Sequence, residues 1–134
     1  MVTDTEILLR LFIAAIAGGL IGFERKTVHK PAGLRTHMIV SMGAALFVLV
    51  TIRTTPNEVA RIIAGIATGI GFLGAGAIFR AENHIKGLTT AASIWTVAAI
   101  GLTAGSGEYV LMAAATILVL LTLELNRIEF FREI

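Results

Sequence analysis

Residues 65–95 read GIATGIGFLGAGAIFRAENHIKGLTTAASIW, and the fold of the chain can be worked out from this stretch. It begins inside an apolar run, Val59–Phe79, which is about 21 residues long and as a helix would span a bilayer core of ~30 Å. In a soluble helix each glycine would cost about 1 kcal/mol relative to alanine, whereas membrane helices use glycine for close backbone approach. We therefore predict a transmembrane helix that packs tightly against a neighbour through Gly65, Gly69, Gly71, Gly74 and Gly76.

Gly69–Gly74 also matches the GxGxxG pattern of dinucleotide-binding proteins. That pattern requires a preceding strand, and here it lies inside a membrane-length apolar run, so we expect no nucleotide site. Two structures are compatible with the glycines of residues 71–76. The helix is either continuous, with a groove for a neighbouring helix, or locally unwound where it lines a cavity.

The composition places the whole chain in a membrane. It has 134 residues and a mean hydropathy of +0.86, with 56% hydrophobic and 15% charged residues, too few to cover a water-facing surface. The absence of cysteine excludes disulfides and thiolate metal sites. We predict an all-α integral membrane protein with one domain, residues 1–134. Its bundle of five transmembrane helices is expected at about residues 7–23, 36–52, 59–79, 87–104 and 109–125.

The basic residues predict the orientation of this bundle. Most of the 11 Lys and Arg lie between the first and second runs, between the third and fourth, or after the fifth. Because cytoplasmic loops carry the excess of positive charge, the N-terminus is expected outside and the C-terminus in the cytoplasm. The same placement explains the positive net charge by topology, so the expected partner is the lipid bilayer and not nucleic acid.

Small residues in the first run predict its contact surface. Ala14, Gly18 and Gly22 recur every four residues and so share one helix face. We expect this face, through Gly18 and Gly22, to pack against the glycine face of the third run.

Two polar clusters are candidates for function. The first lies between the first two runs, where an ion pair of Glu24 with Arg35 is expected, and the second opens the fourth run. Each has two interpretations: the first is a membrane-boundary site or simple anchoring, and the second lines a cavity or bonds to helix carbonyls. The candidate residues are Glu24, Arg25, Arg35, Thr36 and His37 in the first cluster, and Lys86, Thr89, Thr90 and Ser93 in the second.

Metal binding and catalysis have little support in the sequence. The three histidines lack ligand spacing, and no apolar run carries an Asp or Glu at its middle, although magnesium needs oxygen ligands. The identity of any metal is left open. No nucleophile–base pair is visible, so we expect neither an enzyme nor a cofactor.

Ordered motifs in the chain resemble the MgtC/SapB family. They are GLIGFER (19–25), AGLRTH (32–37), GIGFLGAG (69–76), KGLTTAASIW (86–95) and AAIG (98–101). The resemblance implies a prokaryotic plasma-membrane protein with about five spans, associated with low magnesium, acid stress and intracellular survival. Its best-known member has been linked to the ATP synthase, which is a partner here by resemblance only. That member also carries a soluble C-terminal domain, whereas this chain ends soon after its fifth run.

Two functions are compatible with these observations. The first is a regulatory protein whose glycine-lined helices bind a partner membrane protein in adaptation to low magnesium or acid stress. The alternative is a small oligomeric transporter or channel for an ion or small anion, working around the polar clusters. We also predict homodimerisation, because the chain has more glycine faces than pairing within one subunit needs.

Overall fold

The computed structural model describes residues 2–81 and 84–125. Within these residues the elements follow one another along the chain with short connections. They are α1 (Asp4–Thr27), α2 (Leu34–Thr54), the 3₁₀ helix η1 (Pro56–Glu58), α3 (Val59–Gly76), β1 (Phe79–Ala81), β2 (His84–Lys86), α4 (Leu88–Ser106) and α5 (Tyr109–Glu124).

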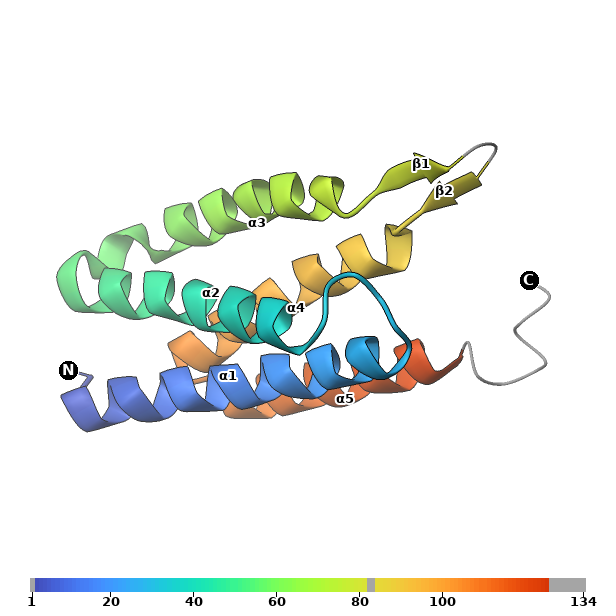
Figure 1. Cartoon of the computed structure of the whole chain (residues 1–134). Coiled ribbons are helices and arrows are strands. Elements are labelled where there is room, and N and C mark those ends of the chain that lie inside the picture. Colours follow the sequence, from blue (N-terminus) through green and yellow to red (C-terminus); the bar gives the residue numbers. More distant parts are fainter. Residues whose placement is uncertain (1, 82–83, 126–134) are drawn as a thin grey trace.

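The predicted helical membrane bundle is confirmed in its main features. Consecutive helices run in opposite directions, and the N-terminus lies at the end opposite to the end of α5 (Figure 1). Among the described residues, α1, α2, η1 with α3, and α4 are long and apolar enough to cross a membrane, while α5 is apolar but shorter. Large apolar side chains also face outward, as lipid-facing surfaces require, and Phe72 is 88% exposed.

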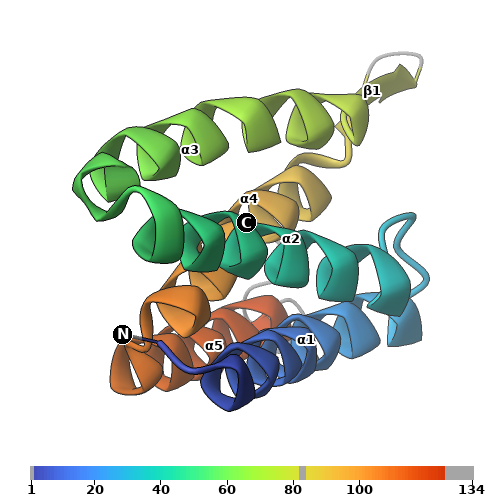
Figure 2. The ribbon, with the colours of Figure 1, turned by 90° about the vertical axis from the view of Figure 1, so that its left-hand side faces the viewer.

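The helices form three layers. Figure 2 shows α1 and α5 together, α2 and α4 in the middle, and α3 on the far side of that middle layer. The core lies between the first two layers, where Ile21, Val97 and Ile100 are buried together with Leu123. The third layer buries little, since Gly74 is the only fully buried residue of α3.

Glycines bring α1 and α4 very close to α2. A Cβ added at Gly18 would lie 2.5 Å from the His37 carbonyl oxygen, and one at Gly22 would lie 2.8 Å from the Leu34 Cα. On the other side of α2, a Cβ at Gly101 would lie only 2.1 Å from the Ser41 carbonyl oxygen. No side chain fits at these three places without moving backbone, so they determine how closely the helices pack.

The glycines of α3 behave differently. A Cβ at Gly65, Gly69, Gly71 or Gly76 would meet nothing within 4 Å, and one at Gly74 would make ordinary contact with Ala91 of α4 at 3.5 Å. The expected pairing of this glycine face with that of the first helix is therefore wrong within the chain, because α2 occupies the face of α1. A hydrogen bond from Trp95 Nε1 to the Ala67 carbonyl oxygen, at 3.2 Å, joins α3 to α4.

The connection from α3 to α4 also differs from expectation. The third helix was expected to reach Phe79, but it ends at Gly76, and Phe79 begins a two-stranded antiparallel hairpin in which it pairs with Lys86. Glycine is a weak helix former, whereas Phe79 and Ile85 favour strands, which accounts for the change. The helix is continuous up to Gly76, so the local unwinding considered for residues 71–76 is absent.

Candidate functional site

A hydrogen-bonded histidine joins the two polar clusters that the sequence placed far apart. His37 of α2 is fully buried, and its Nδ1 lies 2.9 Å from the Gly33 carbonyl oxygen. Its Nε2 lies 3.0 Å from Ser93 Oγ of α4, and that hydroxyl lies 2.8 Å from the Thr90 carbonyl oxygen. If Nδ1–H donates to Gly33, Nε2 is an acceptor, and the one Ser93 proton is shared between Nε2 and the carbonyl.

Next to this histidine, α2 carries a buried polar atom without a partner. The Ser41 hydroxyl is fully enclosed and makes no hydrogen bond with the described residues. Ser41 lies between Gly18 of α1 and Gly101 of α4, where both helices come close to α2. The sequence did not single out Ser41, because a lone serine in an apolar helix usually bonds to a carbonyl oxygen of its own helix.

The last turn of α1 holds a buried ion pair. Arg25 Nε donates to Glu24 Oε2, and Arg25 Nη2 donates to Glu24 Oε1 at 2.7 Å. The expected pair of Glu24 with Arg35 is therefore wrong, since Glu24 is engaged by its neighbour and Arg35 lies exposed at the start of α2. Only the folded structure shows that the chain turns back over Arg25, where the Lys30 N–H donates to the Arg25 carbonyl oxygen at 3.0 Å.

The remaining predicted residues lie around the ends of these helices. Thr36 is half-buried, Lys86 and Thr89 are exposed, and Thr90 is buried. Lys86, Thr89 and Thr90 line a cavity of about 600 Å³ that also includes His29 and Lys30 from the α1–α2 loop. The sequence reading missed those two residues, because nothing in it showed that this loop meets the start of α4.

At the opposite end of the bundle, Arg10 is a second buried cation that the sequence did not single out. It forms an ion pair with Glu6 one turn earlier, and its Nη1 donates to the Gly105 carbonyl oxygen of α4 at 2.8 Å. An arginine four residues after a glutamate is typical of helix surfaces, so the pattern gave no sign of burial. Arg10 instead ties α1 to the last turn of α4.

The described residues contain no cluster of three or more His, Asp or Glu side chains that could hold a metal ion. Magnesium takes several oxygen ligands, usually with one or two carboxylates. Glu24 and Glu6 each face an arginine, so their charge is already compensated. These carboxylates are therefore engaged in ion pairs within α1.

Ser93→Ala tests the bond between α2 and α4. Removal of the hydroxyl leaves His37 Nε2 buried without its partner, which should lower the free energy of unfolding by about 1–3 kcal/mol. Thermal unfolding in detergent measures this loss. Thr116→Ala is a matched control, because Thr116 is buried and bonds only within its own helix. An equal loss in both variants would show that the His37 bond adds nothing.

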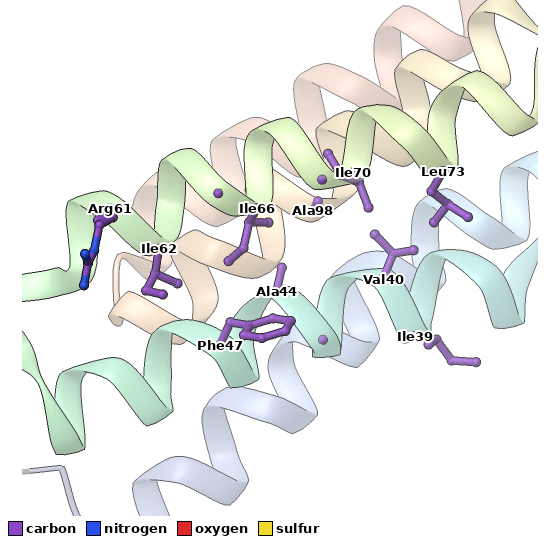
Figure 3. A pocket seen from close by; sticks show the side chains of 13 residues that line it. Ile39, Val40, Ala44, Phe47, Arg61, Ile62, Ile66, Ile70, Leu73 and Ala98 are labelled. Atoms are coloured by element: carbon purple, nitrogen blue, oxygen red, sulfur yellow. The ribbon is translucent and has the colours of Figure 1, made fainter.

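A second feature is an apolar groove of about 560 Å³ between α2 and α3. Figure 3 shows Ile62, Ile66 and Ile70 pointing from α3 toward α2, with the Phe47 ring on the α2 side. Glycines on both walls keep the groove open: Gly43 lies on α2, and Gly65 and Gly69 lie on α3. Arg61 also lines the groove. This groove runs along most of α3, the helix that is least buried in the bundle.

Comparison with known proteins gives consistent results. The model described as MgtC family matches residues 11–129. YhiD of Escherichia coli K12, named provisionally as a magnesium transporter, is 45% identical over 136 residues, which cover 95% of this chain and 63% of YhiD. MgtC of Salmonella typhimurium LT2 is 46% identical over 113 residues, 84% of this chain and 49% of MgtC. SrpB of Synechococcus elongatus is 39% identical over 143 residues, 92% of this chain and 79% of SrpB.

The chain thus spans about half to two thirds of the length of YhiD and MgtC. No solved structure matches it.

Proposed function

Since the chain belongs to the MgtC family, we propose that it is a regulatory membrane protein that binds a partner membrane protein in adaptation to low magnesium or acid stress. The observation that carries this proposal is the open apolar groove between α2 and α3. Its glycines allow a partner helix to approach the backbone closely, which is how membrane helices associate in lipid.

The packing of α3 supports this role. The helix is joined to α4 by the Trp95 hydrogen bond, and Gly74 lies beside Ala91 with room for a Cβ, while its other glycines face open space. Within lipid the hydrophobic effect provides no drive between helices, so a surface of this shape gains stability from van der Waals contact with another helix. Either a second copy of this chain or a different protein can supply that helix, so homodimerisation belongs to the same proposal.

The location and orientation are part of the proposal. The relatives and the apolar helices support a multi-pass membrane protein, and we place it in the plasma membrane of a prokaryote. The end of α1 with Arg25 and Lys26, and the loop after it with Lys30, are assigned to the cytoplasmic side, with the N-terminus outside.

Leucine at Gly69 tests the groove directly. Because a Cβ there meets nothing within 4 Å, Gly69→Leu should leave the unfolding temperature in detergent unchanged while filling the groove. We expect this variant to lose growth rescue at low magnesium in a strain that lacks the protein. Gly71→Leu is the control, since Gly71 lies on the same helix with equal space but does not line the groove. Full rescue by Gly69→Leu would contradict the proposal.

A transporter or channel is the second candidate, supported by the cavity that Lys30, Lys86 and Thr90 line at one end of the bundle. Proteoliposome flux assays with magnesium and with small anions separate the two functions. Flux that Gly69→Leu leaves intact would favour transport over partner binding.

A further inference from the structure

The cavity beside the start of α4 has the character of an anion site. It lies where the α1–α2 loop, the hairpin and α4 come together at one end of the bundle (Figure 1). Its volume is about 600 Å³, and its cationic or titratable lining residues are His29 and Lys30 from the loop and Lys86 from β2. None of the described lining residues is acidic, so its electrostatic character is positive.

The helix α4 begins beside this cavity, and no side chain caps its first turn. Gly87 is the N-cap residue of α4, with φ of 93° and no side-chain hydrogen bond to the first turn. The first helical bond runs from the Ala91 N–H to the Gly87 carbonyl oxygen at 2.8 Å. The N–H groups of Leu88, Thr89 and Thr90 thus have no partner within the helix, and they carry its partial positive charge.

A threonine side chain that lines the cavity provides an independent observation. Thr90 lines the cavity and is 2% exposed, yet its side chain makes no hydrogen bond with the described residues. Further along α4, by contrast, Thr96 and Thr103 donate to the carbonyl oxygens of Ala92 and Ile100 at 2.8 and 2.7 Å. The fully enclosed side-chain atoms without a partner in the described residues are Arg10 Nε and Ser41 Oγ, so the Thr90 hydroxyl is not sealed off and can meet a ligand atom in the cavity. A hydrogen bond to that ligand atom would be stabilising.

We propose that this cavity binds a phosphate group. Its oxygens would accept from the N-terminal N–H groups of α4 and from the Thr90 hydroxyl, while Lys30 and Lys86 neutralise the charge. The neighbouring apolar lining of Phe79 and Ile85 suits the carbon skeleton of a phosphate ester. The group can come from an anionic phospholipid at the membrane surface or from a phosphate ester in water. This site is separate from the α2–α3 groove on which the proposed function rests.

Titration of the purified protein in dodecyl maltoside, followed by thermal unfolding, tests the site. The probes are dioleoylphosphatidylglycerol, a galactolipid with the same acyl chains and no phosphate, and glycerol 1-phosphate in water. Wild type should be stabilised saturably by at least one phosphate compound and not by the galactolipid. Lys30→Gln with Lys86→Gln should weaken this binding by about tenfold or more, because each lost contact is charge-assisted.

Matched variants separate the site from general charge and folding effects. Lys26→Gln removes a lysine in the last turn of α1 that does not line the cavity, and Thr116→Val removes a buried hydroxyl elsewhere; both should bind as wild type does. Thr90→Val should bind more weakly. A response to the lipid alone identifies a headgroup site, and a response to glycerol 1-phosphate identifies a site for soluble esters. Equal weakening by Lys26→Gln, or no difference between the phosphate compounds and the galactolipid, would overturn the proposal.

Discussion

Alanine in place of Gly101 should cost the protein about 3 kcal/mol or more of its free energy of unfolding, at the upper end of overpacking effects. The added Cβ would lie 2.1 Å from the Ser41 carbonyl oxygen and 2.8 Å from the Ser41 Cα. Both are backbone atoms in the middle of α2, so no side-chain rotation can relieve the overlap. The helices α2 and α4 must move apart, which also lengthens the bond between His37 and Ser93.

Guanidinium or thermal unfolding in detergent measures the effect, and size-exclusion chromatography reports aggregation. Gly69→Ala and Gly71→Ala are the controls, because both add a Cβ to a helical glycine with nothing within 4 Å. They should be neutral or stabilising by up to about 1 kcal/mol, the difference in helix propensity. If Gly101→Ala were as stable as these controls, the close contact of α2 with α4 would not exist in solution.

The contrast between Gly101 and Gly69 shows what sequence patterns can and cannot predict. Gly101 and Gly105 have the same four-residue spacing as Gly65 and Gly69, and both pairs lie in apolar helices of similar length. The spacing shows that a helix face is flat enough for close approach. It does not show which helix arrives there, because that depends on the order and crossing of helices far apart in sequence. Hydropathy predicted the helices, but it could not place α3 outside the core.

The residues of the polar site could also be predicted from the sequence, but their pairing could not. His37 and Ser93 were each candidates because polar groups at membrane depth are unusual. Their bond joins positions on α2 and α4 that no local pattern relates. The pairing of Glu24 was wrong for a related reason. Adjacent residues on a helix point in different directions, so the sequence favoured a partner on the next helix. In the structure the long Arg25 side chain nevertheless reaches the Glu24 carboxylate, and both side chains are buried.

Removal of the Glu24 charge should be the most damaging single change at the polar end of the bundle. Arg25 is 4% exposed, and Glu24 is the acidic partner of its guanidinium. Glu24→Gln leaves that buried cation uncompensated, which costs about 3–5 kcal/mol in comparable proteins. We expect a lower unfolding temperature in detergent, reduced membrane abundance and loss of growth rescue at low magnesium. Arg35→Lys should retain all three, because Arg35 is exposed and makes no ion pair with the described residues.

A double variant separates the charge itself from the packing around it. Glu24→Gln with Arg25→Gln removes both charges, so no buried ion remains uncompensated, and its loss should be smaller than that of Glu24→Gln alone. If stability returns in the double variant while growth rescue does not, the pair takes part in the function of the protein. If both return, the pair only holds the end of α1 beneath the loop that bonds to Arg25. Wild-type stability of Glu24→Gln would show that Arg25 reaches water in the membrane, contrary to its burial here.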